Sequence, residues 1–307
     1  MRMRLVFSVS GSLLLSAAAF AQSDEEKAKT FFKNGLQEKA GSYVSSRIEQ
    51  SLTERFQNLE VDITDLDGDD TRVTLLTVQP LYENADAGRV TFFQGSLIVM
   101  DDADTLNLGL GQRWILRDGT LIAGVNLFYD NEWAAGHERM SVGGELLSSV
   151  GDFRINSYTA LSDTEVANGA NETALDGMDM ELAVPLPYLP STRLHAKNFK
   201  WDGEAGANDI EGDTISLRAT LPRGFELEAG STSYDNTAAE DADFVSLSFN
   251  LARFHNQQFA SQPQLISEQA FALTDITDRR FEKVRRKNQI VKQVRKAGIV
   301  VVKGAAQ

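Results

Sequence analysis

The sequence predicts an all-β protein, a 12-stranded antiparallel transmembrane β-barrel with a short N-terminal helical segment and a C-terminal linker. Three observations predict it: an export-type N-terminus, strand-length segments with alternating polarity, and connections that are alternately short and long. We therefore divide the chain into a signal peptide (1–21), a periplasmic helical segment (22–58), the barrel (59–254) and a basic linker (255–307).

The N-terminus has the pattern of a cleaved signal peptide. Arg2 and Arg4 precede an apolar stretch from Leu5 to Phe20, and Ala19-Phe20-Ala21 supplies the small residues of a cleavage site. The apolar stretch is short and interrupted by Ser and Gly, which disfavours the alternative of a retained anchor. The sequence has no cysteine, so a disulfide scaffold, thiol catalysis and thiolate metal sites are excluded.

The segment after the cleavage site is helical in character. It has few β-branched residues, and its apolar side chains recur at helical spacing, as at Val44, Ile48, Leu52 and Phe56. After Leu59 the apolar period changes from 3.6 to 2, which marks the start of the strands.

About twelve strand-length segments follow, up to Phe254. In residues 105–110, leucines alternate with Asn107 and Gly109, and in residues 178–186 apolar side chains alternate with Asp179 and Glu181. A soluble β-sandwich would also produce alternation. The strongly polar second face is what a water-filled lumen requires, and it favours the barrel.

The connections separate the barrel from the sandwich. Short turns are expected at Arg117–Gly119, Ser149–Asp152, Tyr188–Ser191 and Pro222–Gly224, and long polar loops at Asn131–Glu138, Ser162–Asp176, Asp202–Glu211 and Tyr234–Ala242. Outer-membrane barrels alternate in this way, with tight periplasmic turns and longer outside loops. An even strand count returns the chain to the periplasm, so residues 255–307 start there.

The charge is distributed unevenly. The body is acidic, whereas residues 279–307 hold ten Lys or Arg against the single acid Glu282. An acidic body argues against nucleic-acid binding. The basic tail is either a solvated periplasmic extension or a plug in an acidic lumen, where ion pairs are stronger than at the surface. The candidate lumen and plug residues are Asp179, Glu181, Glu226, Glu228, Arg218, Arg285, Arg286 and Lys287.

The chemistry-bearing residues point to no enzyme. The three histidines, His137, His195 and His255, have no nucleophile at a recognisable spacing, and no HExxH, Walker or dinucleotide motif occurs. Asp65–Asp70 is similar to the start of a calcium loop but lacks the bidentate Glu near position twelve, so a turn explains it better. We expect no catalytic residue, cofactor or metal.

Three further groups have two explanations each. Aromatic girdles at the membrane interfaces would hold Trp114, Phe128, Tyr129, Trp133 and Trp201. Acidic loop residues, Glu165, Glu172, Asp209 and Glu240, would bridge lipopolysaccharide through divalent ions or simply keep the loops soluble. Glycines at positions 109, 111, 124, 143, 144 and 230 make room for a threaded segment or allow the sheet to bend.

Several stretches of the chain resemble the β-domain of the intimin/invasin family, the inverse autotransporters. They are TLNLGLGQRWIL from Thr105, GVNLFYDNEW from Gly124, GHERMSVGGELLSS from Gly136 and, upstream, QPLYEN from Gln79. FEKVRRKNQIV from Phe281 is similar to the family's linker motif, carried here by Phe281, Val284, Asn288, Ile290 and Val291.

The resemblance implies a function. In that family a 12-stranded barrel anchors the protein in the outer membrane, and a C-terminal linker threads the pore and carries an adhesive passenger. It implies contact with lipid and lipopolysaccharide, and with periplasmic chaperones and barrel-assembly machinery. The sequence shows no passenger and no peptidoglycan-binding module, so we expect anchoring and export of the C-terminal segment rather than adhesion. The alternatives are a stand-alone porin-like channel, a surface-binding protein acting through its outer loops, or a truncated relative.

Overall fold

The computed structural model describes residues 58–64, 72–84, 88–100, 104–167, 169–235, 241–250, 262–296 and 299–304. The expected signal peptide and nearly all of the expected helical segment lie outside these ranges, as do Asp65–Asp70, Glu240, Phe254 and His255. No helix in the described ranges is long and apolar enough to cross a lipid bilayer.

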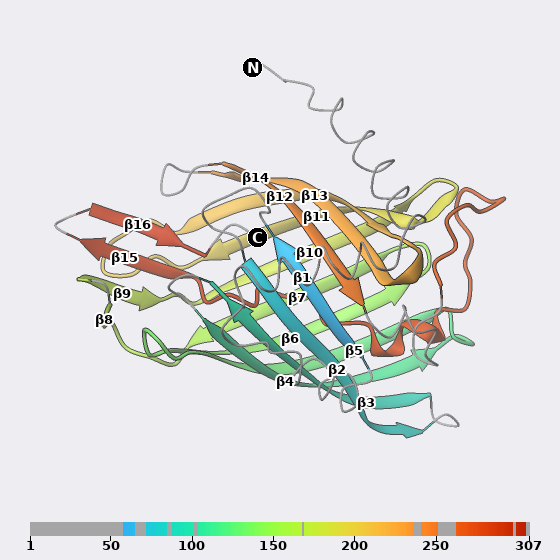
Figure 1. Ribbon diagram of the computed structural model, residues 1–307, viewed down its shortest axis with the longest axis horizontal. Helices are drawn as coiled ribbons and strands as arrows, with labels where there is room; N and C mark the ends of the chain where they lie inside the picture. Colours follow the sequence, from blue (N-terminus) through green and yellow to red (C-terminus); the bar gives the residue numbers. More distant parts are fainter. Residues whose placement is uncertain are drawn as a thin grey trace, which may run out of the picture.

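Twelve antiparallel strands close into a barrel, as the sequence predicts (Figure 1). In chain order they are β1 (Leu59–Thr64), β2 (Arg72–Asn84), β3 (Arg89–Val99), β4 (Thr105–Leu116), β5 (Leu121–Glu132), β6 (His137–Ser148), β7 (Asp152–Ala160), β10 (Gly177–Leu186), β11 (Leu189–Trp201), β12 (Ile210–Thr220), β13 (Phe225–Tyr234) and β14 (Ala242–Asn250). Pairing of β1 with β14, for example Val61 with Phe249, closes the ring. Closure matters because an open edge would leave backbone groups unpaired in lipid.

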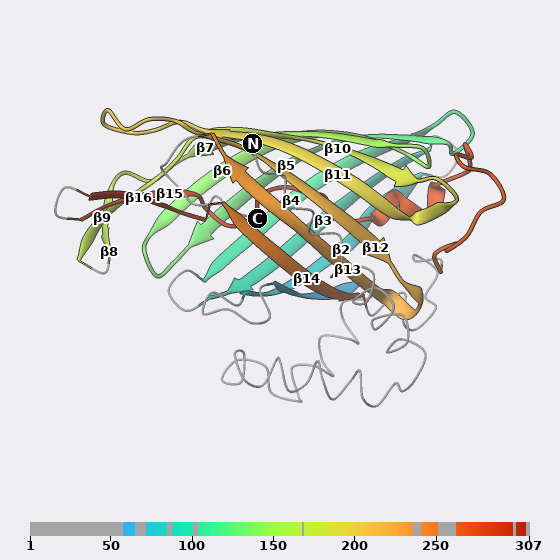
Figure 2. The ribbon, with the colours of Figure 1, turned by 90° about the horizontal axis from the view of Figure 1, so that it is seen from above.

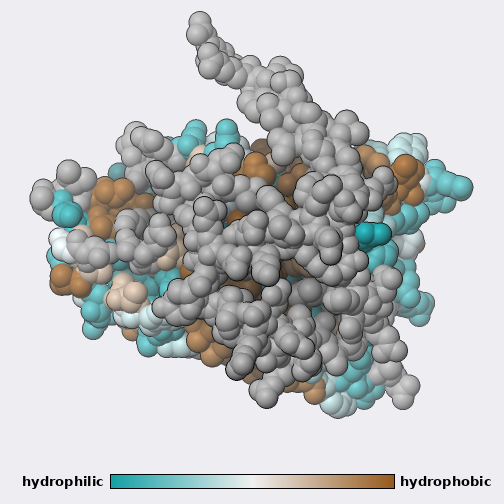
Figure 3. Space-filling model, in the orientation of Figure 1, coloured by the Kyte–Doolittle hydropathy of each residue, from teal (hydrophilic) through white to brown (hydrophobic). Residues whose placement is uncertain are grey.

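The alternation along each strand sorts the side chains between outside and inside. On β4 the outward Leu108 and Leu110 are 41% and 54% exposed, while the inward Asn107 is fully buried. The wall seen in Figure 3 carries apolar patches along its lower edge, and hydrophilic groups gather at the right-hand end. This division is what a barrel with a lipid-facing outer surface requires.

The short turns lie at one end of the barrel and the long loops at the other (Figures 1 and 2). Arg117 and Asp118, between β4 and β5, adopt φ of 52° and 54°. Such left-handed turn residues match the twist of the flanking strands and keep the hairpin tight. We call the two ends the short-turn end and the long-loop end.

A second sheet lies at the long-loop end and departs from the expected arrangement. It contains β8 (Glu165–Ala167), β9 (Ala170–Ala174), β15 (Lys292–Lys296) and β16 (Ile299–Lys303), in the order β16-β15-β9-β8. The loop expected at Ser162–Asp176 therefore carries a hairpin, and the C-terminal segment pairs with it, as Gln293 does with Thr173. Local pattern did not reveal β15, because its sequence KQVRK is mostly basic.

Two of the five expected girdle aromatics point into the barrel instead. Trp114 and Trp133 are 37% and 51% exposed on the outside, but Phe128 and Trp201 are each only 1% exposed and face inward. The ring of Phe128 lies against Gly109 on the neighbouring strand, where a Cβ atom would collide with it.

The same arrangement recurs with Phe92 over Gly111 and Phe244 over Gly230. These three glycines therefore make room for aromatic rings of the wall itself. This is a different reason from the two that the sequence suggested, a threaded segment and sheet curvature.

Candidate functional site

The C-terminal segment runs through the barrel from the short-turn end to the long-loop end (Figure 2). It first lies against two short turns, where the Tyr188 N–H donates to the Ala270 carbonyl at 3.2 Å and the Ile276 N–H donates to the Gly119 carbonyl at 2.8 Å. The 3-10 helix η2 (Thr277–Phe281) enters the mouth, residues 282–291 cross the interior, and β15 continues beyond. We call residues 277–291 the crossing segment.

Side chains of the wall hold the backbone of the crossing segment. Gln94 brackets Val284, accepting from its N–H at 2.7 Å and donating to its carbonyl at 3.2 Å. Arg139 donates to the Lys287 carbonyl at 2.6 Å. Four more wall side chains bond the backbone in the same way: Asn107, Arg113, Asn156 and Tyr158. All six of these side chains come from β3, β4, β6 and β7. Buried backbone groups need such partners, so this wall is shaped to hold an extended chain.

An apolar cluster anchors the start of the crossing segment. Phe281 and Val284, two of the linker-motif residues, pack among inward-facing side chains of β2, β3 and β5, namely Leu76, Val78, Val90, Phe92 and Phe128. Ile290 and Val291, further along, are both 0% exposed. The inner face is thus less uniformly polar than its alternation suggested, because it carries an apolar patch where the crossing segment packs.

Inside the lumen, one carboxylate on β5 lies between two arginines. Asp130 on β5 contacts Arg139 of the wall at 2.8 Å and Arg286 of the crossing segment at 2.6 Å, and all three side chains are fully buried. The Arg286 guanidinium also lies 4.5 Å from the centre of the Phe128 ring, a cation–π contact. The side-chain oxygen of Asn288, the third linker-motif residue, accepts a hydrogen bond from Arg286 at 3.2 Å.

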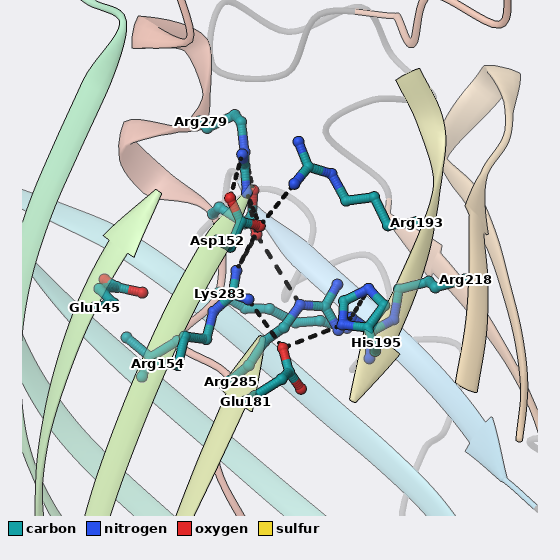
Figure 4. Close-up of polar contacts among 12 residues, drawn as sticks. Glu145, Asp152, Arg154, Glu181, Arg193, His195, Arg218, Arg279, Lys283 and Arg285 are labelled. Carbon is teal, nitrogen blue, oxygen red and sulfur yellow. Dashed lines mark hydrogen bonds and ion pairs between the residues drawn. The ribbon is translucent and has the colours of Figure 1, made fainter. Parts of the chain in front are cut away.

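A denser network of charges lies nearer the short-turn end (Figure 4). Asp152 is surrounded by Arg154, Arg193 and Arg279 at 3.2, 3.1 and 2.8 Å. Glu282 of the crossing segment contacts Arg279 at 2.6 Å and Arg154 at 3.3 Å, which joins wall and segment through shared partners.

The expected acidic lumen residues all face inward, but they differ in what they contact. Glu226 pairs directly with Arg285 of the crossing segment at 3.0 Å. Glu181 contacts Arg154 and His195 of the wall, and Glu228 contacts Arg218 at 2.6 Å. Asp179 accepts from Asn156 and from the Tyr158 hydroxyl, at 2.7 and 2.6 Å. Lys287 is buried and lines a lumen cavity.

In the described ranges, sequence reasoning missed five barrel carboxylates that meet the tail: Glu60, Glu83, Asp130, Glu132 and Asp152. A signal for two of them was present. Asn126, Phe128, Asp130 and Glu132 occupy every second position of β5, and all four are buried polar or aromatic groups facing inward.

The far end of the crossing is tied to the long-loop end. Lys292 contacts Glu132 at 2.5 Å and Glu172 at 2.8 Å, and His137 lies 3.6 Å from Glu172. Glu172 is 3% exposed, so it is neither a solvated loop residue nor a bridge to lipopolysaccharide. Beyond it, Arg295 donates to the Glu204 carbonyl at 2.7 Å.

The loop that receives Arg295 is itself held in shape by a surface ion pair. Asp209 contacts the Lys200 ammonium at 2.6 Å and accepts from the Gly203 N–H at 3.0 Å. These two contacts hold the pKa of Asp209 below its usual range. The carboxylate therefore stays ionised at neutral pH, and the interaction weakens as the pH falls towards that lowered pKa. Asp209 serves the loop, and across the described ranges no group of three His, Asp or Glu side chains is placed to hold a metal ion.

Comparison with known proteins gives one family. The family model described as "Inverse autotransporter, beta-domain" matches residues 10–288. Intimin from Escherichia coli O127:H6 is 23% identical over 273 residues, which are 85% of this chain and 28% of intimin. Invasin from Yersinia enterocolitica is 30% identical over 131 residues, 41% of this chain and 15% of invasin. The chain thus spans less than a third of the curated relatives it matches.

A solved structure, reported under the heading "Unveiling the Mechanism Behind the in-meso Crystallization of Membrane Proteins", has the same fold. It superposes with a TM-score of 0.64 at 20% identity, covering 78% of this chain and 99% of the other.

Proposed function

Since this chain belongs to the inverse autotransporter β-domain family, we propose that its barrel anchors in the outer membrane and carries its own C-terminal segment through the lumen to the cell surface. The observation that carries the proposal is that side chains of the barrel wall contact the crossing segment along its whole length. Its backbone is hydrogen-bonded by the wall, its cations meet Asp152, Glu226 and Asp130 in turn, and Lys292, directly beyond it, meets Glu132. A solvated periplasmic extension would need none of these contacts.

The orientation in the proposal follows from the connections. Tight turns face the periplasm and longer loops face outward in barrels of this kind. The segment would then enter from the periplasm at Asp275–Phe281 and reach the outside at β15. A stand-alone porin-like channel is less well supported, because the crossing segment occupies much of the lumen.

The proposal includes the route by which the chain arrives. A signal peptide cleaved after Ala21 would direct it to the periplasm, where chaperones and the barrel-assembly machinery would act on it, with lipid and lipopolysaccharide as its final surroundings. We propose no catalytic role. The adhesion and invasion that the relatives' names suggest would need regions beyond the fraction of those proteins that this chain matches.

The first test asks whether the tail reaches the long-loop end. Thr173 on β9 and Gln293 on β15 are direct partners in an antiparallel pair, at a spacing compatible with a disulfide. We expect Thr173→Cys/Gln293→Cys to form an intramolecular disulfide in the folded protein, seen as a mobility shift reversed by reductant. Because the chain has no cysteine of its own, no other thiol competes.

The control pair is Thr173→Cys/Gln264→Cys, since Gln264 precedes the crossing segment and lies at the short-turn end. Equal cross-linking of the two pairs, or none in the first, would rule out the proposed path.

The second test asks which end faces outward. Val166 on β8 is 77% exposed at the long-loop end, and Leu273 is 64% exposed at the short-turn end. With a membrane-impermeant maleimide on intact cells, we expect Val166→Cys to be labelled and Leu273→Cys to be labelled only after the outer membrane is permeabilised. The reverse labelling pattern would contradict the proposed orientation.

A further inference from the structure

The crossing segment is held unequally by the two sides of the lumen. Most of the hydrogen bonds to its backbone come from β3, β4, β6 and β7. The β1 side adds one long contact, in which the Asn58 amide donates to the Phe281 carbonyl at 3.4 Å, and the Leu175 N–H donates to the Val291 carbonyl at the far end of the segment. Towards β1 and β13 it extends charged side chains instead, with Lys283 reaching Glu60 and Arg285 reaching Glu226. These long side chains reach across a gap between the segment and strands β1 and β13. No such gap is left where the wall hydrogen-bonds the backbone directly.

Two cavities occupy that gap. One, of about 320 Å³, opens at the short-turn end and is lined by residues such as Asn58, Pro190 and Arg193. The other, of about 140 Å³, lies towards the long-loop end and is lined by residues such as Thr64, Arg72 and Lys197. Each volume far exceeds that of one water molecule and each lining is largely polar, so both cavities are suited to hold water.

The cavities share a small set of lining residues where they meet. These are Glu60, Leu76, Arg218, Glu226, Lys283 and Arg285. Lys283 lies between two carboxylates, in contact with Glu60 and 3.8 Å from Glu226. Its side chain is 17% exposed, and those of Glu60 and Glu226 are 12% and 15% exposed. This is a wetter setting than the fully buried Asp130 pair on the opposite side.

We propose that a path for small ions runs beside the crossing segment, and that Lys283 closes it by bridging Glu60 and Glu226. The proposal rests on the proposed function, because it requires the crossing segment to be in the lumen. The bridge lies where the two cavities meet, and its side chains are joined by ion pairs rather than by backbone. The segment therefore seals the barrel against solutes, while its resistance to ions depends on one lysine.

The test is the ion conductance of the full chain in planar bilayers. We expect low conductance for the wild type and a several-fold increase for Lys283→Met, because removing the ammonium opens the junction. Lys283→Arg keeps a cation that can bridge the carboxylates, and we expect it to stay close to the wild type.

The matched control is Lys200→Met, which also removes a lysine paired with two carboxylates but lines neither cavity. We expect its conductance to equal that of the wild type. No increase for Lys283→Met, or an equal increase for Lys200→Met, would overturn the proposal.

Locking the tail separates this inference from the proposed function. The Thr173→Cys/Gln293→Cys disulfide keeps the crossing segment in the lumen. In that background a retained increase for Lys283→Met supports the ion path, whereas an increase that disappears means that the segment had left the lumen, which overturns it. A lock that never forms overturns the ion path together with the proposed function.

Discussion

Asp130→Asn is expected to destabilise the folded barrel by about 3–5 kcal/mol, the usual cost of removing one partner from a buried ion pair. The substitution keeps the shape of the side chain but leaves Arg139 and Arg286 facing each other across a neutral amide. All three side chains are fully buried, so water does not compensate. The measurement is a urea titration of the barrel in lipid, with heat-modifiable gel mobility as a second readout of the folded fraction.

A second substitution tests the cause of that loss. In Asp130→Asn/Arg286→Gln one of the two uncompensated cations is also removed, so we expect part of the stability to return. The recovery would show that charge, rather than lost packing, is responsible. If the single and double variants are equally unstable, or if Asp130→Asn matches the wild type, the Asp130–Arg286 ion pair does not hold the crossing segment in place.

Val142→Arg is expected to destabilise the barrel by about 2–4 kcal/mol in a bilayer, the cost of an arginine facing lipid near the midplane. Val142 lies near the middle of β6 and is 60% exposed on the outer face. In lipid this exposure means contact with acyl chains, whereas in water the same substitution would cost little. The free energy of folding into vesicles, from denaturant titration, measures the difference.

The matched control is Val166→Arg, the same substitution at a valine that is 77% exposed on β8, in the second sheet at the long-loop end. This valine lies beyond the barrel wall, so we expect no measurable change. Equal effects at the two positions would mean that the outer face of β6 does not meet lipid, and the membrane placement of the barrel would fail with it.

Some features of the lumen were accessible to local pattern and others were not. The inward positions of Asp179, Glu181, Glu226 and Glu228 follow from a period of two along a single strand. The partner of each does not. Glu226 forms an ion pair with Arg285 of the crossing segment, whereas Asp179 accepts hydrogen bonds from Asn156 and Tyr158 of the wall.

The difference arises from barrel geometry. Which inward residue meets a given cation depends on strand register, tilt and the height at which the segment crosses. Asp130 and Arg286 are 156 residues apart in sequence, and no local period relates them. Phe128 and Trp201 were misplaced for a related reason, because an aromatic near a strand end suits an interface girdle as well as an inner wall.

The sequence by itself determined the barrel wall: twelve strands, an apolar outer face, and short turns at the end opposite the long loops. These properties are local, since the period of two and the turn residues are read within ten or fifteen positions. Tertiary structure alone decided that the basic tail lies inside the wall, that it pairs with β9 at the far end, and that one side of the lumen holds it tightly while the other side leaves two cavities. Those outcomes depend on contacts between distant segments, and only the closed ring brings such segments to the same height.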